Sequence, residues 1–209
     1  MRRVISIPKV YALIPEIFNL NELCKTIEVM LNNGITLFQY RSKFKKNSQK
    51  TKEILHLLEV IRSKKGLLII NDDVNIALDT KADGVHLGEN DMSLTQARAI
   101  LGNDYIIGIS CYSSIPKALN MEKIGADYVA FGSCFPTKTK LSARIMDLNI
   151  LENIGSINIP KVLIGGINLQ NLKKLLEYEF DCIALSQAIF RSSNIEQDIK
   201  RFFLLLNNE

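Results

Sequence analysis

The stretch that decides the fold is residues 67–91, LLIINDDVNIALDTKADGVHLGEND. Two short apolar runs, Leu67–Ile70 and Gly84–Leu87, each end in polar residues, and Val74–Thr80 between them is long enough for a brief helix. This order predicts a strand–helix–strand unit with parallel strands. Neighbouring strands lie about 4.8 Å apart, so the acidic residues that follow the two runs are expected to meet.

An acidic cluster follows each of the two runs. Residues 71–73 (NDD) follow the first and residues 89–91 (END) follow the second. Magnesium prefers a few hard oxygen ligands and keeps room for water and phosphate, so carboxylates from the two clusters could share one Mg²⁺ ion. Asp and Asn are also common turn residues. For one residue alone the turn is the better explanation, but clusters at the ends of two consecutive strands make a metal site an equal alternative, and both interpretations stay open.

The same alternation of strand and helix extends along the whole chain. It occurs eight times without a linker or a break in composition, which predicts an α/β fold with a single (β/α)8 TIM barrel over residues 1–209. The expected strands are residues 10–13, 35–40, 67–70, 84–87, 106–109, 128–131, 162–164 and 183–185. The expected helices are residues 21–33, 47–66, 74–80, 93–101, 113–124, 146–153, one from Asn168 or Asn171, a short one after residue 185, and 195–206.

Composition excludes several classes of protein. The formal net charge of +4 is mild and there is no Trp, which argues against a nucleic-acid partner. No apolar run is long enough to cross a bilayer, and the N-terminus does not read as a signal peptide. The four cysteines lack metal-ligand or disulfide spacing and read as reduced core thiols. We therefore expect a cytoplasmic protein with small-molecule partners and no membrane partner, and the sequence leaves open whether it forms a homo-oligomer.

Several loops carry signals for anionic ligands. Gly165-Gly166 and Ser186-Gln187 follow the seventh and eighth strands, where barrels bind phosphate with backbone N–H groups. The loop 136–140 (PTKTK) adds hydroxyls and lysines, and Arg41 and Lys43 follow the second strand. Glycines also serve tight turns, but their position in the barrel favours phosphate. This capacity exceeds the need of one phosphate ester and suggests two phosphorylated ligands.

The histidines do not form a nucleophilic triad with Ser and Asp. His56 is expected on the surface of a helix without a chemical role. His86 lies inside a short strand, and two interpretations stay open: a buried, hydrogen-bonded core residue or a side chain that points into the barrel mouth. The expected chemistry is therefore charge stabilisation of a leaving group, without a covalent enzyme intermediate.

Six ordered motifs resemble thiamine-phosphate synthases over nearly the whole chain. They are QYRSK (39–43), NDD (71–73), GVHLGEND (84–91), GIS (108–110), PTKTK (136–140) and IGGI (164–167). The resemblance implies a (β/α)8 barrel that joins a pyrimidine methyl diphosphate to a thiazole phosphate. The implied products are thiamine phosphate and pyrophosphate, and the implied cofactor is Mg²⁺.

The resemblance also implies roles for individual residues. Asp72 and Asp91 would bind Mg²⁺. The pyrimidine diphosphate would contact the 39–43 motif and further residues, namely Gln39, Tyr40, Arg41, Ser42, Lys43, Asn71, Ser110 and Lys140. The thiazole phosphate would contact the 137–139 loop, Gly166 and the backbone after the eighth strand, namely Thr137, Lys138, Thr139, Gly166, Ser186 and Gln187. Arg41, Lys43, Ser110 and Lys140 are the catalytic candidates.

The chain departs from the family pattern at four positions. Glu89 stands where the family usually has Gln, Ser133 replaces a proline, and Gln187 replaces a serine. Tyr112 stands where a histidine is often found, and the related thiazole tautomerases use a histidine in that neighbourhood for proton transfer. Two other functions are alternatives: a thiazole tautomerase and a non-catalytic barrel that binds thiazole phosphate. Asp72, Asp91 and the Gln39–Lys43 motif favour the synthase over both.

Overall fold

The computed structural model describes residues 7–16, 19–137 and 144–207. Eight parallel strands of this described chain form a closed barrel in sequence order, with β1 paired to both β2 and β8. The strands are β1 (Val10–Ile14), β2 (Leu37–Tyr40), β3 (Leu67–Asn71), β4 (Gly84–Leu87), β5 (Ile106–Tyr112), β6 (Tyr128–Phe131), β7 (Lys161–Ile164) and β8 (Cys182–Leu185). The predicted (β/α)8 barrel is therefore confirmed.

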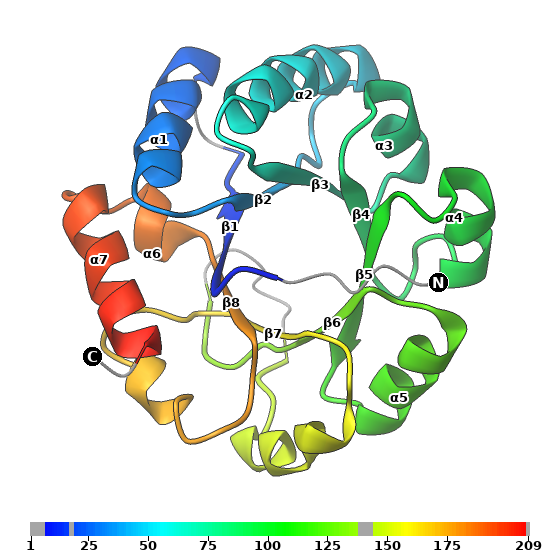
Figure 1. Cartoon of the computed structure of the whole chain (residues 1–209), viewed down its shortest axis with the longest axis vertical. Coiled ribbons are helices and arrows are strands. Elements are labelled where there is room, and N and C mark those ends of the chain that lie inside the picture. The colour runs from blue at the N-terminus through cyan, green and yellow to red at the C-terminus, as the bar shows by residue number, and fades with distance from the viewer. Residues whose placement is uncertain (1–6, 17–18, 138–143, 208–209) are drawn as a thin grey trace.

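Helices form a ring outside the barrel (Figure 1). The helices are α1 (Leu20–Asn32), α2 (Asn47–Arg62), α3 (Val74–Thr80), α4 (Leu94–Leu101), α5 (Ile115–Ile124), α6 (Gln187–Phe190) and α7 (Ile195–Leu206), with 3-10 helices η1 (Leu148–Ser156) and η2 (Leu172–Lys174). Within the residues that the structure describes, no helix is long and apolar enough to cross a membrane.

Short polar side chains begin several of these helices. Asp73 accepts a hydrogen bond from the N–H of Ile76 at 3.0 Å and so caps α3. Ser93 and Ser114 cap α4 and α5 in the same way. At α1 the expected start at Asn21 is wrong, because the side chain of Asn19 accepts from the N–H of Asn21 and the helix begins at Leu20.

The connections around β7 differ from the expected α-helices. The segment expected at 146–153 forms the 3-10 helix η1, and the helix expected from Asn168 or Asn171 is reduced to the three-residue η2. Asn and β-branched Ile have modest helix propensity, and η1 contains Gly155 near its end. Short connectors of this kind often adopt 3-10 geometry.

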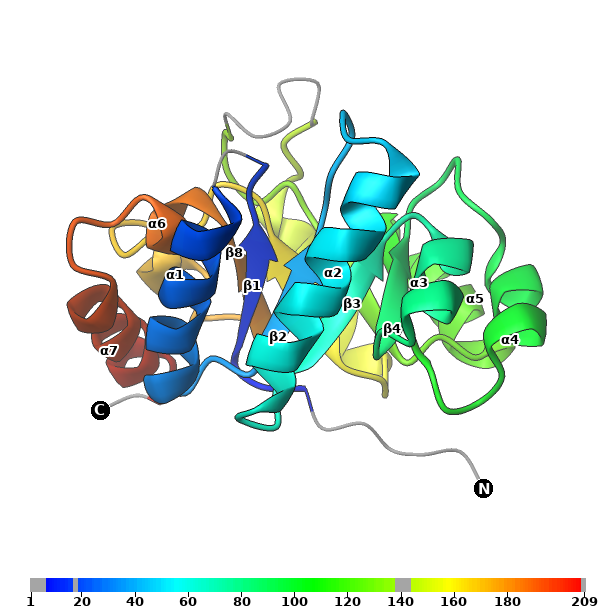
Figure 2. The same cartoon turned by 90° about the horizontal axis from the view of Figure 1, so that it is seen from above.

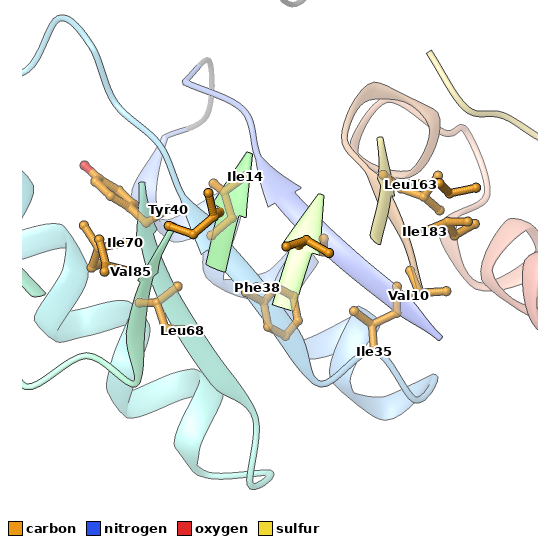
Figure 3. Packing of buried hydrophobic residues seen from close by; sticks show 14 of the residues in the cluster. Val10, Ile14, Ile35, Phe38, Tyr40, Leu68, Ile70, Val85, Leu163 and Ile183 are labelled. Atoms are coloured by element: carbon orange, nitrogen blue, oxygen red, sulfur yellow. The ribbon is translucent and has the colours of Figure 1, made fainter. Parts of the chain in front are cut away.

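Strand side chains alternate between two apolar layers. One layer, shown in part in Figure 3, packs between the barrel and its helices and includes Val10, Phe38, Leu68 and Ile183. The other layer fills the barrel interior and contains Tyr11, Leu37, Ile69, Ile106, Tyr128, Ala130, Val162, Cys182 and Ala184. Because successive residues of a strand point to opposite faces, this alternation fixes which side chains point into the barrel.

Gly108 makes room for the largest interior ring. A Cβ at this position would lie 1.9 Å from the ring of Tyr128. We expect Gly108→Ala to lower the free energy of unfolding by roughly 1–3 kcal/mol, because the fully buried ring has no space to move into. Denaturant unfolding measures the loss. Gly155→Ala is the matched control, since its added Cβ meets the flexible end of Glu179, and equal stability losses in the two variants would contradict the packing argument.

Candidate active site

Several of the predicted functional residues lie at the carboxyl ends of the strands. Figure 2 views the barrel from the side, and the loop from β2 into α2 stands at the end toward which the strand arrows point. A cavity of about 500 Å³ lies at this end, and its lining includes Ser42, Lys43, Asn71, Asp72 and Met92. In (β/α)8 barrels this end carries the active site.

Asp72 and Asp91 face each other, as the sequence predicted. Asp72 follows β3 with a left-handed φ of 67°, which Asp tolerates better than most residues. Its N–H donates to the carbonyl oxygen of His86 at 2.8 Å, so the turn is tied to β4. Asp91 is held from the other side, because its Oδ2 accepts the N–H of Gly88 at 2.6 Å.

The close approach of the two carboxyl groups changes the acidity of Asp72. Burial raises the pKa of Asp72, and a hydrogen bond with Asp91 and the negative charge of Asp91 raise it further, to about 6. The positive charges of Arg41 and Lys43 act in the opposite direction. Two carboxylates that share one site cannot both ionise easily unless a cation accompanies them.

This donor set fits a magnesium ion. Mg²⁺ is usually bound through one or two carboxylates, with water and substrate phosphates completing its coordination. In the described part of the chain, no three His, Cys, Asp or Glu side chains form a metal-binding group. Glu89 therefore does not form a third carboxylate beside Asp72 and Asp91. The paired aspartates suit a metal that also binds a substrate phosphate.

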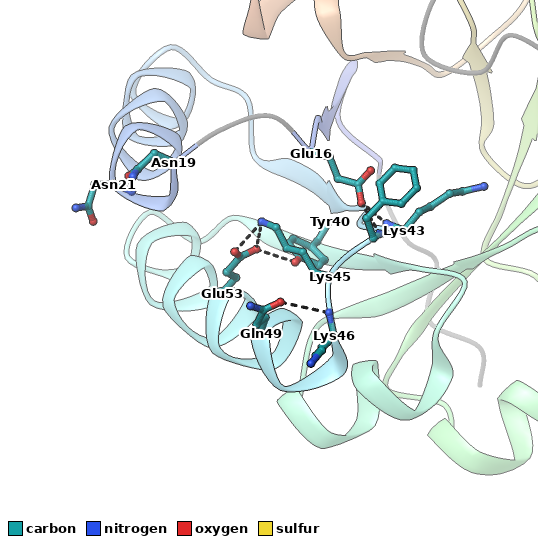
Figure 4. A network of polar contacts seen from close by, with 10 residues as sticks. Glu16, Asn19, Asn21, Tyr40, Lys43, Lys45, Lys46, Gln49 and Glu53 are labelled. Carbon is teal, nitrogen blue, oxygen red and sulfur yellow. Dashed lines mark hydrogen bonds and ion pairs between the residues drawn. The ribbon is translucent and has the colours of Figure 1, made fainter.

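The loop after β2 is fixed by a carboxylate from the end of β1. Glu16 Oε1 accepts the N–H groups of Lys43 and Phe44, the latter at 3.1 Å. Burial acts to raise the pKa of Glu16, but these N–H donors and the charge of Arg41 outweigh it and lower the pKa. Figure 4 shows the Lys43 side chain extending away from Lys45, which pairs with Glu53 at 2.7 Å.

Tyr40 does not join the residues at the barrel mouth. Its ring belongs to the layer between the barrel and the helices, and its hydroxyl donates to Glu53 Oε2 of α2 at 2.8 Å. Gln39 is its neighbour on β2, and the alternation of the strand directs Gln39 into the barrel, where its Nε2 reaches Tyr11. The predicted substrate contact through the Tyr40 side chain therefore lacks support from this geometry.

Gln39 and Ser110 are connected through the barrel interior by a hydrogen-bonded chain that we call the interior relay (Gln39, Tyr11, Tyr128, His86 and Ser110). Gln39 Nε2 donates to the Tyr11 hydroxyl at 2.8 Å, and the two tyrosine hydroxyls are 3.2 Å apart. His86 Nδ1 lies 2.9 Å from the Tyr128 hydroxyl, and its Nε2 lies 2.9 Å from Ser110 Oγ. Burial lowers the pKa of His86 to about 4, so the ring is neutral at pH 7.

The position of His86 agrees with parts of both interpretations drawn from the sequence. The side chain is buried and hydrogen-bonded, and it also contacts Ser110, a predicted site residue. Tyr11 and Tyr128 were not predicted from the sequence. The available signal was strand periodicity, because residues two apart on a strand point to the same face. By this rule Gly84 and His86 share the inner face of β4, and Gly108 and Ser110 share the inner face of β5. His56 is half exposed on α2 and lies 3.9 Å from Glu59, away from these residues in the helix ring.

The loops after β6 and β7 come together at Gly165 and Gly166. Phe135 N–H donates to the carbonyl oxygen of Gly165 at 3.0 Å, and a Cβ at Gly166 would lie 2.3 Å from the carbonyl oxygen of Pro136. Both glycines have left-handed φ values, 104° and 63°. Thr137 directly follows Pro136 in this loop. Lys138, Thr139 and Lys140 lie outside the described residues.

Ser186 and Gln187 follow β8, as expected. Ser186 precedes α6, and its carbonyl oxygen accepts the N–H groups of Ile189 and Phe190. Its side chain makes no capping hydrogen bond. On β5, Tyr112 has a φ of 55°, and the ammonium of Lys117 lies 5.0 Å from the centre of its ring.

Comparison with known proteins gives consistent matches. The family model described as "Thiamine monophosphate synthase" matches residues 10–189. The thiamine-phosphate synthase of Nitrosomonas eutropha is 36% identical over 199 residues, which cover 95% of this chain and 94% of that protein. The thiamine-phosphate synthase of Clostridium acetobutylicum is 40% identical over 183 residues, covering 87% and 86%.

A solved structure agrees with these sequence matches. The thiamine phosphate pyrophosphorylase of Pyrococcus furiosus superposes with a TM-score of 0.84 at 32% identity, and the match covers 96% of each chain. The family model and both relatives extend over most of the barrel that holds the paired aspartates. This chain therefore belongs to the thiamine monophosphate synthase family.

Proposed function

We propose that this enzyme joins a pyrimidine carrying a methyl diphosphate to a thiazole phosphate, with release of pyrophosphate and formation of thiamine phosphate. The family and the names of its relatives support a transferase of this type. The single observation that carries the assignment is the facing pair Asp72 and Asp91, with the charges of Arg41 and Lys43 acting on it. Two small phosphorylated substrates account for anion-binding loops on several sides of the barrel mouth.

The diphosphate is held in this proposal by the loops after β2 and β3. Arg41 and Lys43 supply positive charge, and Glu16 fixes the loop that presents Lys43. Asn71 lines the cavity beside Asp72. Lys140 is a further proposed contact from the 136–140 loop. A loop that is already fixed loses little conformational freedom when the substrate binds.

The thiazole phosphate is proposed to bind across the opening, at the loops after β6, β7 and β8. Thr137 and Thr139 offer hydroxyl donors. Gly166 and the backbone at Ser186-Gln187 offer N–H groups, which suit a phosphate dianion. The contact between Pro136 and Gly166 supports one shared binding region for these loops.

The reaction exchanges a carbon–oxygen bond for a carbon–nitrogen bond. The pyrimidine methylene loses the diphosphate oxygen, which keeps the bonding electron pair, and the thiazole nitrogen then donates its lone pair to the same carbon. Arg41, Lys43 and Lys140 are proposed to stabilise the charge that grows on the departing pyrophosphate. A Mg²⁺ ion held by Asp72 and Asp91 would supply further charge neutralisation for the diphosphate. No strong protein base is needed, because the attacking nitrogen carries no proton.

The two other functions have less support. A thiazole tautomerase would not need the paired aspartates, and both curated relatives described above are synthases. Tyr112 also stands where the tautomerase histidine is expected, and its ring lies beside Lys117. A non-catalytic barrel that binds only thiazole phosphate would not need a carboxylate pair beside Arg41 and Lys43. We further propose that the reaction takes place in the cytoplasm.

The requirement for magnesium is expected to depend on pH. Since the pKa of Asp72 is raised to about 6, protons compete with Mg²⁺ for this carboxylate below that pH. We expect the Mg²⁺ concentration for half-maximal rate at pH 5 to be about tenfold higher than at pH 7. Initial rates of thiamine phosphate formation over a Mg²⁺ series measure this, with a chelator-treated sample as baseline. An identical Mg²⁺ requirement at both pH values, or full activity in chelator, would contradict the metal assignment.

A further inference from the structure

The hydrogen bonds of the interior relay run in one direction. Each tyrosine hydroxyl brings one hydrogen, and a neutral histidine brings one ring N–H. Tyr11 accepts the amide N–H of Gln39, so its own hydrogen goes to the oxygen of Tyr128. Tyr128 in turn donates to His86 Nδ1. The ring proton of His86 is therefore on Nε2 and is donated to Ser110 Oγ.

With the Gln39 amide oriented as in the structure, Nε2 toward Tyr11, the opposite direction leaves a buried donor without an acceptor. Only an amide turned over to present Oε1 to Tyr11 would allow that direction, so the orientation of Gln39 sets the direction of the relay. If His86 Nδ1 carried a proton, Tyr128 would accept it and donate to Tyr11. The hydrogen of Tyr11 would then point at the amide N–H group of Gln39, and both residues are at most 3% exposed. An unmade hydrogen bond in such a place is costly. Doubly protonated His86 meets the same conflict at Tyr11.

The rings of the relay have little room to turn. Tyr128 packs edge-on to Tyr11 with ring centres 6.1 Å apart, and it stacks on His86 at 5.6 Å. The absent side chain of Gly108 leaves space for the Tyr128 ring, and a Cβ there would collide with it. Tyr11, Tyr128 and His86 are all buried. A site residue held by a rigid support keeps one geometry through the reaction.

We propose that Tyr11 and Tyr128 are positioning residues: they hold His86 in the Nε2–H tautomer and thereby fix the Ser110 hydroxyl as a donor to an acceptor atom of the bound pyrimidine diphosphate. Because Ser110 accepts from His86, its own hydrogen is directed to the ligand. The inference rests on the proposed function, since it takes Ser110 as a contact to that substrate. The direction of the relay itself is a property of the protein without substrate.

Nitrogen NMR tests the direction of the relay. The chain contains two histidines, so long-range ¹H–¹⁵N correlations of the wild-type protein give two ring patterns. A His56→Gln variant removes the signals of the half-exposed ring on α2 and assigns the other pattern. We expect His86 to show a protonated Nε2 and an unprotonated Nδ1 at pH 7. A protonated Nδ1, in the neutral or the charged ring, would overturn the proposal.

Kinetics test whether the relay acts through Ser110. We expect Tyr128→Phe to lower kcat/KM for the pyrimidine diphosphate by about tenfold, the loss of roughly one hydrogen bond, with KM for the thiazole phosphate unchanged. In a Ser110→Ala background the same change should have no further effect. Tyr105→Phe is the matched control, because Tyr105 precedes β5 at the opposite end of the barrel. If the fold-losses in kcat/KM of Tyr128→Phe and Ser110→Ala multiply in the double variant, the two residues act independently, and the positioning role of Tyr128 is overturned.

The two measurements separate this inference from the proposed function. A wild-type enzyme that forms no thiamine phosphate would refute the proposed function, whereas the tautomer of His86 is read without any substrate. If Tyr128→Phe fails to fold, the wild-type spectrum still decides the direction of the relay. The Tyr11→Phe variant then provides the kinetic test in the same Ser110→Ala comparison.

Discussion

Replacement of Asp72 by Asn is expected to lower kcat by on the order of 10²–10³-fold. The amide keeps the size of the side chain but removes one of the two charges that are proposed to hold Mg²⁺. The affinity for thiazole phosphate should change little, because its proposed binding loops lie after β6, β7 and β8. Steady-state rates with each substrate varied in turn, at saturating Mg²⁺, measure this effect.

The same substitution should stabilise the metal-free protein. The pKa of Asp72 is raised to about 6 in the folded chain from an ordinary value near 3.8, so its charged form is destabilising at pH 7. This effect shrinks as the pH falls through about 6 and is lost only below about pH 3, where the carboxyl group is protonated in both the folded and the unfolded chain. Discounted for partial exposure, the gain is about 1 kcal/mol, or roughly 2–4 °C in Tm.

Asp73→Asn is the matched control for both measurements. Asp73 is the next residue, but its carboxylate caps α3, and Asn serves that role equally well. Its kcat and Tm should therefore stay close to the wild-type values. If Asp72→Asn and Asp73→Asn lost activity to the same degree, the assignment of Asp72 to the metal would be refuted. Thermal scans at pH 4 and pH 7 in chelator separate the charge effect from a change in packing.

Replacement of Lys43 by Ala is expected to lower kcat/KM for the pyrimidine diphosphate by about 10²-fold. Lys43 lines the cavity, and its charge acts on Asp72. The loss removes a charge proposed to stabilise the departing pyrophosphate, so kcat should fall as well as affinity. KM for the thiazole phosphate should stay unchanged. A coupled assay for released pyrophosphate measures all three quantities.

Lys46→Ala serves as the control in the same loop. Lys46 is also exposed but stands at the start of α2, where its N–H meets the side chain of Gln49. Both variants remove one lysine charge, so the general attraction of the protein for anions falls equally. Equal kinetic losses would show that Lys43 acts only through net charge. That result would remove Lys43 from the proposed catalytic set.

The sequence predicted the barrel well because its strands are bounded by clear signals. Gly84–Leu87 and Tyr128–Phe131 were predicted with the bounds that the structure shows. The approach of Asp72 to Asp91 was also predictable, because both follow neighbouring parallel strands and Asp favours such turns. The contact requires only the register of β3 against β4, which pairs Asn71 with His86.

The interior relay was harder to predict for a physical reason. Strands β2, β4 and β6 are buried on both faces, so polarity does not distinguish inward from outward side chains. Tyr40 was expected at the site, whereas the alternation of β2 sends Gln39 inward and Tyr40 toward Glu53. The meeting of Tyr11 with Tyr128 depends on closure of the barrel across strands that are distant in sequence.

The tyrosine rings at the centre of the barrel also determine how molecules reach the site. Tyr11 and Tyr128 are at most 1% exposed and fill the barrel interior. In the described structure their rings therefore block a path from the amino-terminal ends of the strands to the site. In the proposed reaction, every substrate and product therefore enters and leaves through the opening at the carboxyl ends of the strands.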